Sequence, residues 1–320
     1  MTRNDGAGER PLDVDTLLIH GGPGPDPATG AVTPPIHPSS TFVRQRIDDN
    51  AKYRYSRGAN PTRDALEGLL ATLEHGVEAA AFASGMAAVN AAMQLLASGD
   101  HAIVGYDCYL TTYDIFANDL PRYGIESSIV DLTDVEAVQA AVRPNTRMVY
   151  IENPTNPLLD VVDLVAMTEI GRASGAITVV DNTFASPYCQ NPIDFGIDLV
   201  VHSTTKYLGG HSDLLGGAVI SRTPELAAQI RERQYNQGAV PSAFDCWLLI
   251  RGIRTLGVRM RQHMANAQAI AEWLEGQPGV TRVLYPGLAS HRGHELAARQ
   301  MRDVGRGGFV RLAVGGLVPG

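Results

Sequence analysis

The chain has 320 residues, of which 44% are apolar and 19% charged, with a net charge of −8. This acidic balance, without a long basic run, argues against nucleic acid and against a membrane surface as partners. No apolar run approaches the length of a membrane span, and the polar N-terminus does not resemble a secretory signal, so we expect a cytoplasmic location.

Residues 1–54 are rich in Gly, Pro, Asp and Thr and show no sustained periodicity. We predict that they form an extended N-terminal arm. The glycine-rich stretch GGPGPDPATG (21–30) follows no strand and opens no helix, which favours a plain loop over a dinucleotide-binding motif. The three cysteines, Cys108, Cys189 and Cys246, lie far apart and are expected to be buried free thiols.

Residues 55–245 are predicted to form an α/β domain. Helical periodicity runs through 62–75 and 85–97, and short apolar runs then alternate with helical stretches. The apolar runs are 102–106, 127–131, 147–152, 177–182, 198–203 and 216–221. Such runs between helices are typical of buried strands, so we expect a mostly parallel sheet.

A domain boundary is predicted near GAVPSAFD (238–245), because long helical patterns dominate from there to residue 276. TRVLYP (281–286) and GGFVRLAV (307–314) then have the composition of strands. We therefore predict that residues 246–320 form a smaller, incomplete C-terminal α+β domain.

Polar side chains follow three of the predicted strands. Asp181 ends one apolar run, Ser203 and Lys206 follow the next, and Asn156 follows a third. In open α/β sheets, ligands bind at the carboxyl ends of the strands. An amine and a carboxylate there suit pyridoxal 5′-phosphate, whose aldehyde forms a Schiff base with lysine and whose ring nitrogen pairs with an acid.

Lys206 is one of only two lysines among 26 basic residues, the rest being arginine. A guanidinium remains protonated and does not form the Schiff base, which gives a reason for an amine at this position. The alternative interpretation of Lys206 is a surface salt bridge. For Asp181 the alternative is a turn or helix cap after the strand.

A phosphate site is predicted at the start of the helical segment FASGMAAVNAAM. Ser84 is placed to cap this helix, which leaves the backbone N–H groups of Gly85 and Met86 for an anion. Ser203 and Thr205 add hydroxyl donors. Simple helix entry is the alternative for the Ser84–Gly85 pair.

Two further sets of residues have open interpretations. Tyr55 and Arg57, in YRYSRGANPTR (53–63), suit charge-assisted binding of a phosphate, or else belong to a solvated basic loop. His202 and His211 suit no compact metal motif, so we predict no metal site.

Several segments together resemble one family, the PLP-dependent enzymes of Cys/Met metabolism, which include the cystathionine γ-synthases and γ-lyases. The matching segments are YSRGANPTR, ASGMAA, ENPTNP, VVDNTFASP, STTKYLGGHSD and GAVPSAFDCWLLIRGIRTL. The resemblance covers essentially the whole chain. It implies the aspartate aminotransferase fold (fold type I) for the large domain.

The resemblance also implies roles for individual residues. Lys206 would hold the cofactor as a Schiff base and move protons, while Asp181 would pair the ring nitrogen. Tyr109 would stack on the ring and assist catalysis, and Asn156 would contact the 3-oxygen side of the ring. The phosphate would be held by Ser84, Gly85, Met86, Ser203 and Thr205, and by Tyr55 and Arg57 of the neighbouring subunit. A homodimer is then the minimum unit, and a homotetramer is expected.

The resemblance implies a small amino acid as substrate and γ-elimination or γ-replacement at a sulfur-bearing or otherwise γ-substituted carbon. A β-lyase, a methionine γ-lyase type enzyme and a specialised-metabolism enzyme are alternatives. A PLP-binding inactive scaffold or subunit is an alternative of another class. The family pattern is expected to continue past residue 320 and to carry there the arginine that binds the substrate α-carboxylate. The arginines of GRGGFVRLAVGG (305–316) do not occupy that place.

Overall fold

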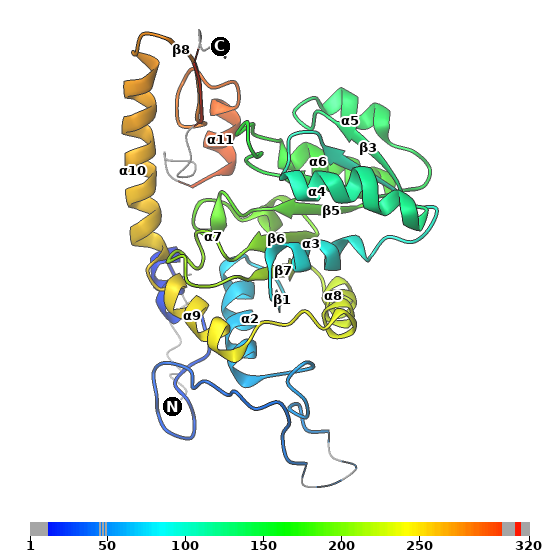
Figure 1. Cartoon of the computed structure of the whole chain (residues 1–320), viewed down its shortest axis with the longest axis vertical. Helices are drawn as coiled ribbons and strands as arrows, with labels where there is room; N and C mark the ends of the chain where they lie inside the picture. The colour runs from blue at the N-terminus through cyan, green and yellow to red at the C-terminus, as the bar shows by residue number, and fades with distance from the viewer. Residues whose placement is uncertain (1–11, 45, 47, 49, 303–310, 315–320) are drawn as a thin grey trace, which may run out of the picture.

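The structure is a computed structural model that describes residues 12–302, apart from residues 45, 47 and 49, and the backbone of residues 311–314. A seven-stranded sheet lies at its centre, with helices packed on both faces (Figure 1). This confirms the predicted α/β class with a mostly parallel sheet. Within the described residues, no helix combines the length and apolar character needed to cross a membrane.

The central sheet has the strand order β1-β7-β6-β5-β4-β2-β3. Strand β7 pairs antiparallel with both neighbours, and all the other pairs are parallel. The strands are β1 (Glu78–Phe82), β2 (His101–Gly105), β3 (Glu126–Val130), β4 (Thr146–Glu152), β5 (Ile177–Asp181), β6 (Leu199–Ser203) and β7 (Gly217–Ser221). Each of the six predicted apolar runs coincides with a strand. The first strand was missed because EAAAF consists mostly of alanine, which favours helices.

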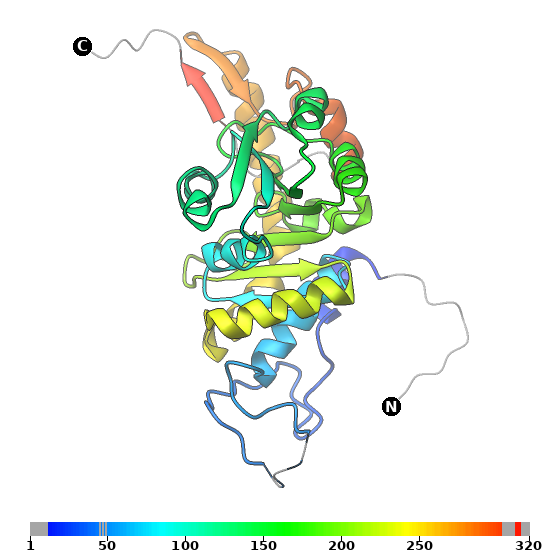
Figure 2. The same cartoon turned by 90° about the vertical axis from the view of Figure 1, so that its right-hand side faces the viewer.

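Two apolar layers cover one face of the sheet, and a third covers the other. On the first face lie α2 (Pro61–Leu73), α9 (Ala243–Ile253) and α10 (Leu256–Glu275) over β1, β7 and β6, with α5 (Val135–Ala141) and α6 (Leu164–Ser174) over β2, β4 and β5. On the opposite face lie α3 (Gly85–Met93), α4 (Leu110–Asp114), the π-helical turn η1 (Ile115–Asp119) and α8 (Pro224–Gln237). Figure 2 shows these layers edge-on. Burial of both faces explains why the central strands are apolar along their whole length.

Shorter elements complete the chain. They are α1 (Val14–His20), η2 (Leu120–Tyr123), α7 (Ser186–Cys189), η3 (Pro192–Phe195), β8 (Val280–Leu284), α11 (His294–Gln300) and β9 (Arg311–Val314). Strands β8 and β9 form a separate antiparallel pair, and β8 packs beside the far half of α10. The first half of α10 belongs instead to the core of the large sheet, through Leu256, Met260 and Met264. Residues 307–310 of the second predicted strand lie outside the described residues, and the predicted domain boundaries stay predictions.

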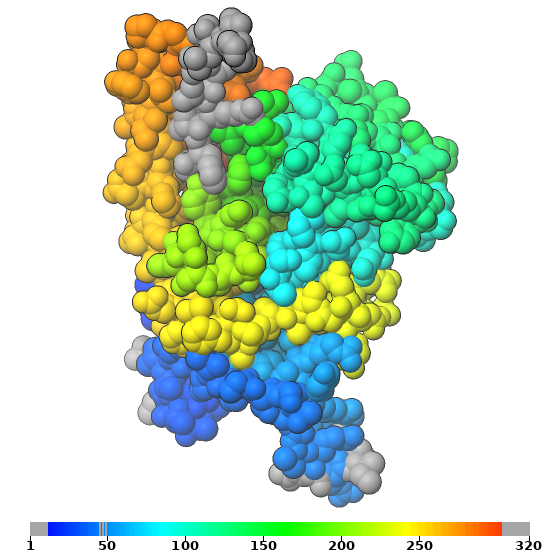
Figure 3. All heavy atoms as spheres, viewed as in Figure 1, coloured from blue at the N-terminus to red at the C-terminus, as the bar shows by residue number. Residues whose placement is uncertain are grey.

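The N-terminal arm contains one helix that the sequence pattern did not predict. Helix α1 is capped by Asp13, whose carboxylate accepts the Asp15 N–H, and it buries Leu18. Residues 22–44 and 50–58 then run as irregular backbone away from the body (Figures 1 and 3). The arm folds back on itself at an isolated bridge between Thr41 and Tyr55. Helix α1 thus lies within the range that was predicted to be without regular structure, and the arm as a unit of residues 1–54 stays a prediction.

Candidate active site

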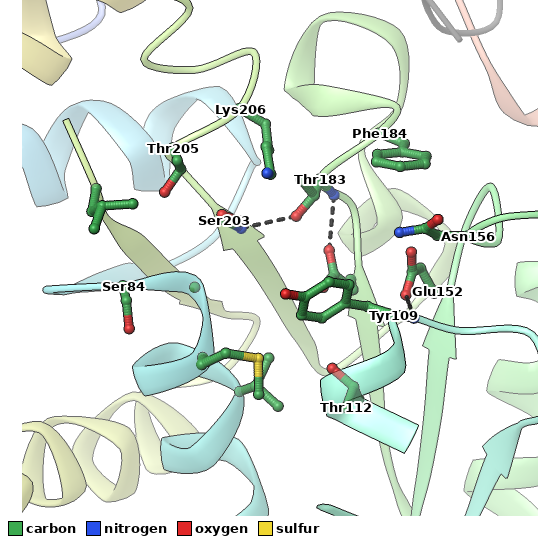
Figure 4. Close-up of a pocket in the computed structure, with 15 residues that line it drawn as sticks. Ser84, Tyr109, Thr112, Glu152, Asn156, Thr183, Phe184, Ser203, Thr205 and Lys206 are labelled. Carbon is green, nitrogen blue, oxygen red and sulfur yellow. Dashed lines mark hydrogen bonds between the residues drawn. The ribbon is translucent and has the colours of Figure 1, made fainter. Parts of the chain in front are cut away.

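A cavity of about 220 Å³ lies at the carboxyl edge of the sheet, where β4, β5 and β6 end beside the start of α3 (Figure 4). Parallel strands present their carboxyl ends at one edge, so side chains distant in sequence meet there. Nine of the predicted residues line the cavity, namely Ser84, Gly85, Met86, Tyr109, Asn156, Asp181, Ser203, Thr205 and Lys206. Six further lining residues were not predicted, namely Val89, Thr112, Glu152, Thr183, Phe184 and Leu215.

Lys206 lies in the turn after β6, with its amine directed toward Thr183 and Ser203 (Figure 4). The turn is held by backbone bonds from Lys206 N to the Ser203 carbonyl, 3.2 Å, and from Gly210 N to the Lys206 carbonyl, 2.8 Å. Lys206 makes no ion pair with any described residue, whereas the other lysine, Lys52, pairs with Asp64 at 2.5 Å. A surface ion pair was the alternative interpretation of Lys206. Among the described residues Lys52 forms such a pair and Lys206 does not.

Two buried carboxyl groups lie at neighbouring strand ends. Asp181 ends β5 and Glu152 ends β4, and the two are paired in register. Burial raises the pKa of Asp181, and burial together with the charge of Asp181 raises the pKa of Glu152 well above its usual range. Asp181 accepts the Thr183 N–H at 3.0 Å but has no ion-pair partner among the described residues. A cationic group in the cavity would offset the cost of burying this carboxylate.

The start of α3 presents backbone donors to the cavity. The Ser84 hydroxyl caps the helix by accepting the Ala87 N–H at 3.1 Å. The N–H groups of Gly85 and Met86 lie in the same first turn and have no acceptor within the helix. Gly85 also allows α3 to approach β6, because a Cβ there would lie 2.7 Å from the Ser203 Cβ. This geometry suits an anion.

The hydroxyls of Ser203 and Thr205 lie opposite the start of α3. The Thr205 hydroxyl accepts the Gly216 N–H at 3.1 Å, and the Ser203 N–H donates to the Thr183 hydroxyl at 2.8 Å. These bonds fix the turn after β6 against β5 and β7. The cavity wall at this end therefore consists of hydroxyls and amides on short, well-anchored turns.

Tyr109 and Asn156 line the side of the cavity formed by the loops after β2 and β4. Tyr109 is 46% exposed, and its backbone N–H donates to a Glu152 carboxylate oxygen at 2.7 Å. Asn156 lies in the loop that follows Glu152. Glu152 thus ties the tyrosine loop to β4, which the sequence pattern did not predict. The rule that located Asp181, a polar residue at a strand end, also applies to Glu152 in RMVYIE.

Tyr55 and Arg57 do not line this cavity. They lie on the arm, where Tyr55 is 46% exposed. The Arg57 guanidinium stacks over the Tyr235 ring at 4.3 Å and donates to the Tyr235 carbonyl at 2.9 Å. Within one chain, therefore, these two residues do not meet the other predicted phosphate ligands.

The remaining predictions concern histidine, cysteine and metal. His202 lies 2.5 Å from the buried Glu74 carboxylate, and a His211 ring nitrogen lies 2.8 Å from the Gly209 carbonyl. Among the described residues, no three His, Cys, Asp or Glu side chains gather as a metal site would require. The three cysteines are free and buried, as predicted, and burial raises the pKa of the Cys108 thiol to about 12.

The cavity fits pyridoxal phosphate. A buried carboxyl without a cation, an amine without a carboxylate partner, and a close helix start with free N–H groups lie around one space. A family model for Cys/Met metabolism PLP-dependent enzymes matches residues 15–316. The chain belongs to this family. Its cofactor is therefore pyridoxal phosphate.

Relatives within the family match over most of the chain. A probable cystathionine γ-synthase of Herpetosiphon aurantiacus is 48% identical over 94% of both chains. The cystathionine γ-lyase of Bacillus subtilis is 48% identical over 94% of this chain and 79% of its own. A cystathionine β-lyase of Lactococcus lactis is 47% identical over 91% of this chain and 77% of its own.

A solved structure agrees with these matches. Cystathionine γ-synthase from Xanthomonas oryzae pv. oryzae, in complex with cystathionine, superposes with a TM-score of 0.93 at 42% identity. The match covers 96% of this chain and 79% of that one. The PLP-dependent family and the fold expected from its sequence motifs are thus confirmed.

Proposed function

We propose that the chain catalyses γ-elimination or γ-replacement on a sulfur-containing or otherwise γ-substituted amino acid, in the manner of cystathionine γ-lyases and γ-synthases. The observation that carries the proposal is that the Lys206 amine and the buried Asp181 carboxyl line the same cavity. A relative with the name probable cystathionine γ-synthase and one with the name cystathionine γ-lyase, each 48% identical to this chain, support the proposal.

In this proposal several groups of the cavity would hold the cofactor. Lys206 would bind its aldehyde carbon, Asp181 would pair its ring nitrogen, and Tyr109 would stack on its ring. Asn156 would contact its 3-oxygen side. Five other lining residues would hold the phosphate, namely Ser84, Gly85, Met86, Ser203 and Thr205. When bound, pyridoxal phosphate supplies an electron sink beside the substrate Cα.

The residues of the chain then move protons. The Lys206 Nζ takes the proton from the substrate Cα and acts next at Cβ, which prepares the Cγ substituent to leave. The Tyr109 hydroxyl lies across the cavity and assists proton transfer to the leaving sulfur. Glu152 holds the tyrosine loop through its bond to the Tyr109 N–H, which would keep the hydroxyl at the cavity.

We propose a homodimer as the minimum unit and a homotetramer as the assembly. Tyr55 and Arg57 support this, because both lie on the arm and neither lines the cavity of its own chain. In the dimer their side chains would complete the phosphate site of the partner. The predicted cytoplasmic location is retained on the ground of the three free cysteines.

The reaction is tested by NMR analysis of the products from L-cystathionine with purified protein and added pyridoxal phosphate. Cγ–S cleavage gives cysteine and 2-oxobutanoate, which is the expected result. Homocysteine and pyruvate would instead assign the enzyme to β-lyases, a name that relatives at 47% identity also carry. A cofactor-loaded protein that converts no γ-substituted or sulfur amino acid would support the inactive scaffold.

Completion of the site by a neighbour predicts recovery of activity in hybrids. Tyr55→Phe and Lys206→Ala variants, each of low activity, are mixed under conditions where subunits exchange. One site of each hybrid dimer then combines Lys206 of one chain with Tyr55 of the other, so activity should return toward about a quarter of the wild-type value for statistical mixing. Activity that stays at the level of the separate variants, with exchange shown by mass spectrometry, would contradict a shared site.

A further inference from the structure

The start of α2, together with its N-cap residue, contacts the arm through three buried side chains. Asn60, Thr62 and Arg63 are 5%, 0% and 1% exposed, although all three are polar and Arg63 is charged. Fully buried arginine is rare, because removing a guanidinium from water costs several kcal/mol unless its donors are paired. The contacts that offset this cost show what the segment does.

Arg63 binds the backbone of the loop that carries the two proposed phosphate ligands. Its guanidinium donates to the Ser56 carbonyl at 2.6 Å and to the Arg57 carbonyl at 3.3 Å. These carbonyls flank Arg57 and follow Tyr55 directly in the chain. Two bonds from one planar group fix the orientation of the peptide unit between them.

Asn60 and Thr62 bind the opposite side of the arm, at Pro35 and His37. The Asn60 amide donates to the His37 carbonyl at 2.8 Å and to the Ser56 hydroxyl at 3.2 Å. The Thr62 hydroxyl donates to the Pro35 carbonyl and accepts the His37 N–H, both at 2.9 Å. The start of α2 therefore binds both sides of the arm, which extends below the body of the molecule (Figure 1).

Arg63 is the first member of a row of alternating charges that continues through Glu67, Arg231 and Glu78. The Arg63 Nε lies 3.5 Å from the buried Glu67 carboxylate, whose other oxygen accepts from Arg231 at 2.7 Å. Arg231 in turn pairs with Glu78 at 2.5 Å. Glu67 also accepts the Ala81 N–H of β1 at 2.8 Å, so the row is anchored in the central sheet.

We propose that Arg63 is a positioning residue for the cofactor phosphate of the neighbouring subunit, acting through the loop that carries Tyr55 and Arg57. This rests on the proposed role of those two residues in the partner's site. Glu67 is anchored in the sheet and holds Arg63, and Arg63 fixes the position of the loop. The position of the loop in turn determines where Tyr55 and Arg57 lie. Arg63 itself touches neither cofactor nor substrate.

The test compares the affinity of the cofactor-free protein for pyridoxal phosphate and for pyridoxal, which lacks the phosphate. Arg63→Lys keeps the charge beside Glu67 but has a shorter reach and a single nitrogen. We expect its affinity for pyridoxal phosphate to fall about tenfold, the size of one charge-assisted hydrogen bond, while its affinity for pyridoxal stays unchanged. Equal losses for both ligands, or none, would overturn the proposal.

A matched control and a second variant support this measurement. Arg231→Lys alters the same charge row on the far side of Glu67 without touching the loop, so the ratio of the two affinities should stay at the wild-type value. Asn60→Asp keeps the oxygen that caps α2 but removes the amide donor to the arm. It should also lower the ratio, and it replaces Arg63→Lys if that variant does not fold.

Failure of the inference is distinguishable from failure of the proposed function. Arg57→Ala removes the proposed phosphate ligand itself and should lower the affinity ratio. If Arg57→Ala lowers it and Arg63→Lys does not, only the positioning role is wrong. If Arg57→Ala also leaves the ratio unchanged, the shared phosphate site is wrong, and the inference falls with it.

Discussion

Replacing Lys206 by alanine is expected to abolish turnover and the absorption band of the lysine-bound cofactor. The variant loses both the amine that holds the cofactor covalently and the base that moves the substrate Cα proton. General base catalysis alone contributes about 10²–10⁴-fold, so we expect a fall in kcat of at least about two orders of magnitude. Absorption spectra and steady-state rates with L-cystathionine measure the two effects.

The chain offers a matched control for this change. Lys52→Ala removes the other lysine, an exposed side chain that pairs with Asp64 and lies over the Tyr53 ring. Such pairs contribute about 0–1 kcal/mol, so spectrum and rate should remain those of the wild type. A Lys206→Ala protein with an unchanged absorption band would show that the cofactor is held elsewhere.

Replacing Asp181 by asparagine is expected to weaken cofactor retention and to lower kcat by about 10²–10³-fold, the usual loss when a preorganised electrostatic partner is removed. The amide retains an oxygen for the Thr183 N–H, so the turn after β5 is preserved. It carries no charge to keep the cofactor ring nitrogen protonated. Rates at saturating pyridoxal phosphate separate the loss of catalysis from the loss of cofactor.

In the cofactor-free protein, by contrast, we expect the Asp181→Asn substitution to increase stability relative to wild type as pH rises. Burial raises the pKa of Asp181, so its protonated form is the one that favours the folded state. That contribution is full below the unfolded pKa, about 3.9, and is lost as pH rises through the folded value. Relative to wild type, apo Asp181→Asn should therefore gain stability as pH rises, as measured by Tm at two pH values.

Asp194→Asn serves as the control for this substitution. Asp194 is an exposed carboxylate that pairs with His75 at 2.8 Å on the surface. Its replacement should leave kcat and cofactor retention unchanged. If Asp181→Asn turns over at the wild-type rate, or if its apo form loses stability as pH rises, Asp181 does not have the proposed role.

The sequence allowed the prediction of those parts of the fold that have strong patterns. The strands β2 and β4 to β7 contain apolar runs because both faces of the sheet are covered there, whereas the edge strand β3 (ESSIV) is only half-buried. Strand β1 gave no such signal, since its alanines have little β propensity. Helix α1 is only seven residues long, too short for its periodicity to stand out from the polar arm.

The same contrast applies to the site. Asp181 and Lys206 were predictable because each is the chemically distinctive residue at the end of a recognisable strand. Arg63 was not, because in the sequence it belongs to a basic, solvent-compatible stretch, and only the fold shows that it is buried against the arm. Glu74, which ends α2 and contacts His202, was likewise not predictable, because the two residues are 128 positions apart.

The most direct test of the account uses the scarcity of lysine in this chain. The cofactor-loaded enzyme is treated with borohydride, which converts the linkage between an amine and the cofactor aldehyde into a stable secondary amine, and its peptides are then mapped by mass spectrometry. With only Lys52 and Lys206 as candidate side chains, we expect the modification on the Lys206 peptide alone. Modification at Lys52 only, or at neither lysine, would contradict the assignment of this cavity as the active site.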